Sequence, residues 1–334
     1  MSEAPTAPHP IGMSSHAEIE PPQRSGTRRT IRSESLRHRL WESRWPYVFL
    51  LPTIALYGVY TLWPIIASWW YSLMSWSGFT ADKTFIGLQN YVDVLHDPLF
   101  WSSFKITMLF MVVTVPLRVG LGLLIAVLLN HPSLPFRKIF RTAFFVPVVT
   151  TTAIVGVVMQ FIFDPASGPV DLVLNNLGAT PIDFLGSANT ALWTVMAVHT
   201  WKWVGVTMIY WLAALQTVPR DLIESAQVDG ANQRRTFRHI TLPLLLPFLV
   251  IITLLTVEQN MRIFDLMLMM TGGGPYYATE VIELYIYRWA FTASVPQLGY
   301  ASAAAVILGL ILLVFAAIQL VGIRVSRRMA GGQE

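Results

Sequence analysis

The stretch from Arg220 to Pro247, RDLIESAQVDGANQRRTFRHITLPLLLP, is polar and basic although it lies between two apolar segments. Its composition favours helix, and Gly230 near its middle marks a turn, because glycine adopts backbone conformations that other residues avoid. The stretch therefore predicts a short helix, a bend and a second short helix at a membrane surface. An excess of positive charge marks cytoplasmic loops. The arginines of this stretch are Arg220, Arg234, Arg235 and Arg238.

The composition of the whole chain indicates a polytopic membrane protein. Of its 334 residues 54% are hydrophobic and only 13% are charged, and the mean hydropathy is +0.53. A soluble domain carries about twice that charged fraction. The chain contains no cysteine, which excludes disulfides and thiolate chemistry, and its seven histidines show no metal-binding spacing, so we expect no metal site.

Six apolar segments are long enough to cross a bilayer, which takes about 20 residues each. We therefore predict an all-α fold with six transmembrane helices and a cytoplasmic coupling helix within residues 216–243, between helices 4 and 5. Residues 1–43 are predicted to form a disordered basic tail, residues 44–323 the membrane domain, and residues 324–334 a second tail. The predicted spans are Tyr47–Tyr71, Ile106–Leu129, Ala143–Phe163, Ala191–Leu215, Pro243–Met270 and Gly299–Ile323.

The distribution of basic residues predicts the orientation of the chain. Seventeen of the 23 Lys and Arg residues fall in residues 1–44, the 131–141 loop, the Arg220–Pro247 stretch and residues 324–334, and three fall on the opposite side. The positive-inside rule then places both termini in the cytoplasm, which agrees with an even number of spans. The basic tail is thus predicted to be a topogenic flank and not a nucleic-acid-binding arm.

Two motifs carry a resemblance to a known family. Glu224, Ser225, Ala226 and Gly230, followed by Ile240, Leu242 and Pro243, fit the pattern E-A-A-x3-G-x9-I-x-L-P, with Ser225 as the departure. This resembles the cytoplasmic signature loop of ABC importer permeases; the alternative is an ordinary amphipathic loop helix. Thr271–Pro275, TGGGP, follows Phe264-Asp265 and resembles a stretch of the carbohydrate-type permeases for maltose, trehalose and glycerol phosphate. It is no phosphate-binding loop, because no GK[ST] follows.

The resemblance implies a set of partners and a division of labour. Two permeases would pair to form the pathway, two cytoplasmic ATPase subunits would bind ATP and Mg²⁺, and an extracytoplasmic solute-binding protein would deliver the substrate. This chain shows no Walker motif, so it is expected to be no enzyme, to bind no cofactor and to reside in the bacterial cytoplasmic membrane. The residues expected to contact the ATPase are Glu224, Ser225, Ala226, Asp229, Gly230, Ala231, Ile240, Leu242 and Pro243.

Charged residues within the spans are the second group of candidates, because each costs about 2.5–3.5 kcal/mol at the bilayer centre on insertion scales. Glu258, Arg262 and Asp265 follow i, i+4, i+7 spacing and are predicted to share one helix face. They line either a polar solute pathway or an ion network between helices. The same choice applies to aromatic side chains, which either stack on sugars or pack in the core. The remaining pathway candidates are Arg118, Lys202, Trp203 and Tyr210.

The predicted solute is a mono-, di- or oligosaccharide, with glycerol phosphate, a polyamine or a peptide as alternatives within the same class of importer. A secondary transporter is a competing class, but such transporters often carry internal repeats, and the sequence shows no clear repeat. An intramembrane enzyme would need paired catalytic residues on facing spans, and the sequence offers none.

Overall fold

The computed structural model describes residues 44–131, 133–180 and 182–331, so the predictions for residues 1–43 lie outside the described residues. The chain divides into two compact units, Met1–Gly58 and Val59–Glu334. The described part of the first unit consists of helix α2, Arg44–Tyr57, and of Gly58 at the start of η1. The second unit contains all other elements and is described by itself.

The second unit is helical apart from a small antiparallel pair, in which Met74 faces Phe85 and Ser75 faces Thr84. Elements labelled η are π-helical turns. The elements after α2 are η1 (Gly58–Leu62), α3 (Trp63–Tyr71), β1 (Met74–Ser75), β2 (Thr84–Phe85), α4 (Gln89–His96), α5 (Pro98–Asn130), α6 (Arg137–Val149), α7 (Thr152–Ile162), α8 (Pro169–Asn176), α9 (Ala191–Leu215), α10 (Arg220–Val228), α11 (Gln233–Thr236), η2 (Phe237–Thr241), α12 (Leu242–Asn260), α13 (Phe264–Met270), α14 (Ile282–Tyr287), η3 (Arg288–Thr292) and α15 (Leu298–Gly331).

Within the described residues, four helical segments are long and apolar enough to cross a membrane, or five if the bent pair α6–α7 counts as one span. Helix α9 matches the predicted fourth span end to end, but its tryptophans, His199 and Lys202 lower its apolarity. Six spans therefore stay a prediction. The four segments are Val48–Tyr71, Pro98–Asn130, Gln233–Asn260 and Leu298–Gln319.

The third predicted span is not one straight helix. Helices α6 and α7 meet at 99° across Thr150 and Thr151. The ammonium group of Lys202 on α9 donates to the carbonyl oxygens of Pro147 (3.1 Å) and Thr150 (2.7 Å). The last carbonyls of a helix lack partners within it and carry partial negative charge, so a buried cation is well suited to hold this break.

The fifth predicted span also breaks. Helix α12 ends at Asn260, and α13 starts only at Phe264. The prediction that Glu258, Arg262 and Asp265 share one helix face is therefore wrong, because the three residues do not lie on one helix.

Three segments predicted to be loops contain helices. Residues 72–104 include α4 and the start of α5, where Asp97 accepts the main-chain N–H of Leu99 as N-cap (2.8 Å). The loops after the third and fifth predicted spans contain α8 and α14, and α15 continues through most of the predicted 324–334 tail. The prediction missed the loop helices because they are only six to eight residues long, and it missed the extension because its basic residues suggested a tail.

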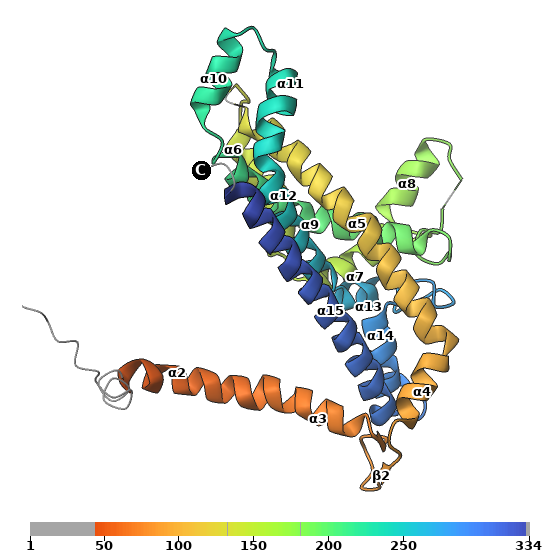
Figure 1. Cartoon of the computed structure of the whole chain (residues 1–334). Coiled ribbons are helices and arrows are strands. Elements are labelled where there is room, and N and C mark those ends of the chain that lie inside the picture. Colours follow the sequence, from red (N-terminus) through yellow and green to blue (C-terminus); the bar gives the residue numbers. More distant parts are fainter. Residues whose placement is uncertain (1–43, 132, 181, 332–334) are drawn as a thin grey trace, which may run out of the picture. The chain divides into compact units, whose positions relative to one another are not determined.

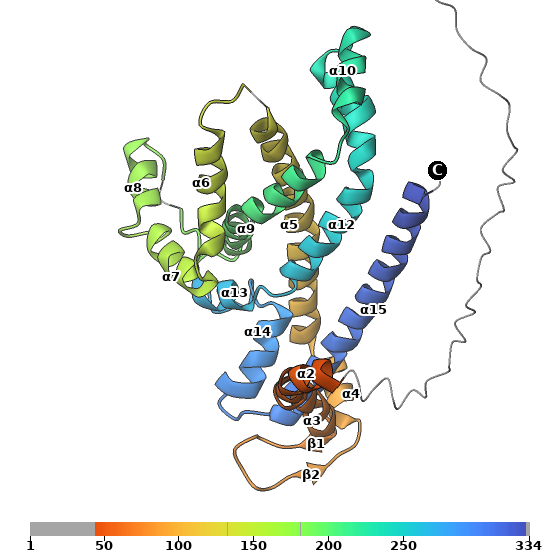
Figure 2. The ribbon, with the colours of Figure 1, turned by 90° about the vertical axis from the view of Figure 1, so that its left-hand side faces the viewer.

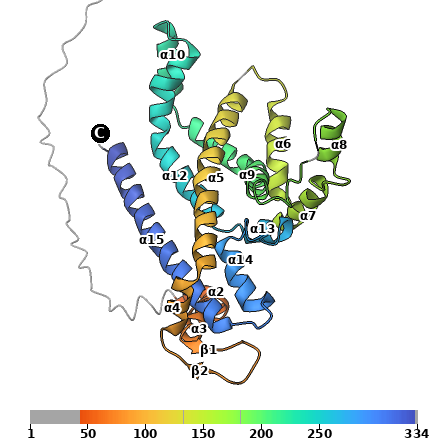
Figure 3. The same ribbon diagram turned by 90° about the vertical axis from the view of Figure 1, so that its right-hand side faces the viewer.

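The core is built on the contact of α5 and α9, which run in the same direction, with α12 packed against both (Figure 2). Buried Trp211 fills this contact, and its indole N–H donates to the carbonyl oxygen of Val119 (3.0 Å). Helix α6 crosses α9 closely at Gly205, where an added Cβ would stand 2.1 Å from the Phe144 carbonyl oxygen. The α10–α11 hairpin lies at one end of the second unit, and the β1–β2 pair with α4 lies at the other (Figures 1 and 3).

Candidate functional site

The coupling hairpin, defined as α10 and α11 with their connection (Arg220–Thr236), projects from one end of the second unit (Figure 1). Gly230 adopts φ +81°, its N–H donates to the carbonyl of Gln227 (3.0 Å), and the N–H of Ala231 donates to that of Ala226 (2.9 Å). These two bonds form a Schellman motif, which ends a helix with a left-handed residue. The predicted turn at Gly230 is confirmed.

The second arm of the coupling hairpin is not a separate short helix, as predicted, but the beginning of a spanning helix. Asn232 caps it by accepting the N–H of Arg235 (2.9 Å). Helices α11, η2 and α12 then run without interruption from Gln233 to Asn260, 28 residues. At 1.5 Å per residue this rod is roughly 42 Å long. The hairpin is thus joined to the interior of the membrane domain by a continuous helix.

The signature residues lie on the surface of the hairpin or at its junction with α12. Glu224, Ser225, Asp229 and Gly230 are exposed, and Asp229 is the C-cap of α10. Val228, which the sequence analysis passed over, is 88% exposed. Pro243 is exposed as well. The remaining residues expected to contact the ATPase are half-buried, namely Ala226, Ala231, Ile240 and Leu242.

A hollow of about 1040 Å³ separates the coupling hairpin from the loop between α5 and α6. Its lining combines buried apolar residues such as Leu215 and Val218 with polar side chains including Arg220 and Glu224. The imidazole Nε2 of His131 lies 3.1 Å from the Gln233 amide nitrogen and ties that loop to the second arm. The 131–141 loop therefore contributes to the same face as the signature residues.

Of the charged pathway candidates, the structure brings two together. Arg262 Nη2 and Glu258 Oε1 form an ion pair at 2.7 Å, and their side chains are 79% and 54% exposed. Asp265 is exposed on α13 but has no described ion pair with them. A charged and exposed pair at the end of a spanning helix is unfavourable against lipid, so this face meets water or a polar protein surface.

Arg118 and Lys202 do not reach this exposed pair. Both side chains are fully buried. Lys202 holds the α6–α7 break and lies 4.7 Å from the ring centroid of half-buried Trp203. Arg118 donates to side chains of α12, and half-buried Tyr210 packs against the core around Trp211. The contacts of these four residues favour the structural reading over direct solute contact.

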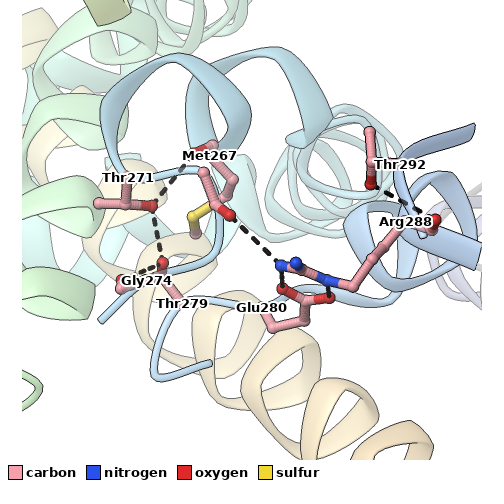
Figure 4. Close-up of polar contacts among 8 residues, drawn as sticks. Met267, Thr271, Gly274, Thr279, Glu280, Arg288 and Thr292 are labelled. Carbon is pink, nitrogen blue, oxygen red and sulfur yellow. Dashed lines mark hydrogen bonds and ion pairs between the residues drawn. The ribbon is translucent and has the colours of Figure 1, made fainter. Parts of the chain in front are cut away.

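The Gly-rich loop after α13 is folded onto itself by polar contacts (Figure 4). The hydroxyls of Thr271 and Thr279 lie 2.6 Å apart, and Thr279 donates to the Gly274 carbonyl (2.7 Å). Arg288 grips the buried carboxylate of Glu280 with Nε (2.7 Å) and Nη2 (2.5 Å), and this hydrogen bonding raises the pKa of Arg288.

Gly273 is required within this loop for two reasons. Its φ of +88° is unfavourable for other residues, and an added Cβ would stand 2.2 Å from Glu280 Oε2. The glycines thus let the loop close over an ion pair that the sequence analysis did not anticipate.

The fold defines a class: a helical membrane protein with several helices apolar enough to cross a bilayer. Among the described residues, no group of three His, Asp or Glu side chains is placed to hold a metal ion. The chain belongs to the family described as "Binding-protein-dependent transport system inner membrane component", which matches residues 118–327 and comprises permeases of ABC importers.

Two relatives and one solved structure illustrate the match. The chain is 33% identical to a probable ABC transporter permease, YurN, of Bacillus subtilis (strain 168), over 82% of this chain and 94% of the relative. It is 33% identical to the trehalose/maltose permease MalF of Thermococcus litoralis, over 77% and 86%. A crystal structure of a bacterial alginate ABC transporter in complex with an alginate pentasaccharide-bound periplasmic protein contains a chain of the same fold. Its TM-score is 0.74 at 24% identity, over 89% of this chain and 98% of that one.

Proposed function

We propose that this chain is a pathway subunit of an ABC importer that takes up a saccharide across a bacterial cytoplasmic membrane, with both termini in the cytoplasm. The family supports the transport role, and the relative named for trehalose and maltose supports the solute class. The orientation rests on the 17 basic residues predicted on one side, which include those of the coupling hairpin.

The observation that carries the mechanism is the unbroken helix from Gln233 to Asn260. Two ATPase subunits that bind ATP and Mg²⁺ would dock beneath the two permeases, and one of them would contact the exposed face of α10, where Glu224 offers a charge and Val228 an apolar contact. Because the helix is continuous through the π-helical turn η2 and Pro247, a displacement of the hairpin would be passed on to Asn260. The motion of the ATPases would then shift the Glu258–Arg262 end of α12 and alternate the access of the pathway.

The solute pathway would form between this chain and a second permease. The exposed ion pair of Glu258 and Arg262, with Asp265 beyond the break, provides polar groups suited to a hydroxyl-rich solute. Arg118, Lys202, Trp203 and Tyr210 would support this wall from behind. An extracytoplasmic binding protein would deliver the solute to the end opposite the coupling hairpin.

Reconstitution tests this proposal. The chain is assembled in lipid vesicles with a second permease, the ATPase subunits and the binding protein, and a panel of saccharides is screened for stimulation of ATP hydrolysis and for uptake. We expect a mono-, di- or oligosaccharide to stimulate both. Stimulation only by glycerol phosphate, a polyamine or a peptide would overturn the solute class, and failure of the chain to retain any ATPase subunit would overturn the coupling role.

A further inference from the structure

A buried polar cluster connects three helices at the end of α12, and its members are Thr114 and Arg118 on α5, His199 on α9, and Gln259 and Asn260 on α12. Arg118, His199, Thr114 and Asn260 are at most 2% exposed. Arg118 Nη1 donates to Asn260 Oδ1 (2.6 Å), and Nη2 donates to Gln259 Oε1 (2.8 Å). We infer that Arg118 is a positioning residue, which fixes the last turn of α12 and thereby places the Glu258–Arg262 pair for transport. This inference rests on the proposed function of that pair.

The directions of the hydrogen bonds allow only one orientation of the Asn260 side-chain amide. A guanidinium group only donates, so both amide oxygens must face Arg118. His199 Nε2 also donates to Asn260 Oδ1 (2.8 Å), while Asn260 Nδ2 donates to Thr114 (2.7 Å), whose hydroxyl donates to the Phe110 carbonyl (2.7 Å). Rotation of the Asn260 amide by 180° would break this chain at three points. The cluster therefore fixes both the place and the orientation of the last residue of α12.

The cluster also lies where the rod ends. Beyond Asn260 the main chain tightens, with Met261 N–H donating to the Glu258 carbonyl and Arg262 N–H to the Gln259 carbonyl, both at 3.3 Å. On the far side of the break, Glu283 of α14 accepts the N–H of Phe264, the first residue of α13 (2.9 Å). Arg118 thus holds one side of a three-residue joint whose other side is held from α14, and the ion-paired Arg262 stands within the joint.

The test uses the absence of cysteine in the chain, which allows two spin labels to be placed without background. Labels replace Val112 on α5 and Leu255 on α12, both exposed, in the assembled complex in lipid discs, and their distance distribution is measured by pulsed electron paramagnetic resonance. Asn260→Leu keeps the volume but accepts no hydrogen bond, so we expect a broadened distribution. Asn260→Asp keeps acceptors for Arg118 and His199, so we expect the narrow distribution of the parent.

The functional readout is the concentration of solute-loaded binding protein that half-saturates ATP hydrolysis, measured with the saccharide that stimulates the parent complex most. We expect an increase of about tenfold for Asn260→Leu and for Arg118→Leu, the size of one charge-assisted hydrogen bond, and no further increase in the double variant, because the two residues act through each other. Thr207→Val is the matched control, since Thr207 Oγ1 makes only a 3.5 Å contact with Arg118.

Two results would overturn the inference. One is a lowered melting temperature for Asn260→Leu with a narrow distance distribution and unchanged half-saturation, which would make the cluster merely structural. The other is an Asn260→Asp variant as impaired as Asn260→Leu. An unstimulated parent complex would instead refute the proposed function, and the label distances, which need no solute, would still decide on the positioning role.

Discussion

Replacing Gly230 by aspartate is the most direct perturbation of the coupling hairpin. Gly230 has φ +81°, and nothing lies within 4 Å of an added Cβ. The substitution therefore introduces no clash, and its cost comes from the backbone alone. We expect insertion and folding to remain intact while ATP hydrolysis and solute uptake become uncoupled.

The magnitude follows from the left-handed conformation, which costs a residue other than glycine roughly 1–2 kcal/mol. Such a cost changes the equilibrium between the closed hairpin and opened forms about 5- to 30-fold. This conformational cost is small compared with the stability of a whole membrane domain. It acts, however, on the two Schellman hydrogen bonds of Gly230 and Ala231, which set the angle between α10 and the helix Gln233–Asn260. Gly230→Asn should be milder than Gly230→Asp, because asparagine is the residue that, after glycine, is found at this left-handed position following a helix.

The assay compares solute uptake per ATP hydrolysed in reconstituted vesicles. Gly178 offers a matched control, because it has φ +77°, has open space around an added Cβ and follows α8, far from the hairpin in the sequence. We expect uptake per ATP to fall at least about fivefold in Gly230→Asp, in line with the conformational cost, and to stay near the parent value in Gly178→Asp. Equal effects of the two substitutions, or normal uptake by Gly230→Asp, would refute the reasoning.

Three further predictions concern the supporting structure. Gly205→Ala should lower the melting temperature through about 1–3 kcal/mol of overpacking against Phe144, whereas Gly120→Ala, with nothing within 4 Å, should not; fluorescence melting in detergent compares them. Lys202→Met should destabilise the fold by about 1–3 kcal/mol, because two buried carbonyls lose their hydrogen-bond donor. Lys202→Arg keeps a donor and should melt at a higher temperature than Lys202→Met; equal melting temperatures would contradict the role of Lys202 as the donor. Burial raises the pKa of Glu283 from its ordinary value of 4.5 to about 7, so the folded chain retains a proton that the unfolded chain releases at lower pH. Stability should therefore fall as pH rises from about 4.5 to 7, and Glu283→Gln should flatten that slope in melting curves recorded across this range.

The coupling hairpin shows how far residue patterns reach. Gly230 and the Asn232 cap could be predicted because turn and cap conformations depend on a few neighbouring residues. The continuity of the second arm with α12 could not be predicted. The change from polar to apolar residues suggested two separate helices, but a single helix can run through such a change in composition. Apolar length likewise located the helical segments Val48–Tyr71, Ala191–Leu215 and Leu298–Gln319 closely. It could not reveal the α6–α7 break, which depends on Lys202 from a distant helix.

By itself, the sequence determined that this chain is a helical membrane protein with a bent polar segment between two apolar ones, since hydropathy and glycine act locally; the cytoplasmic side of that segment stays a prediction from its arginines. Only the tertiary structure decided which of the charged residues in the predicted spans are buried and which are exposed. Arg118 is buried against Gln259 and Asn260, more than 140 positions away, whereas Glu258 and Arg262 are exposed as a pair. Whether a charge faces solvent or the core depends on which helices pack against it, and no spacing within a single span carries that information.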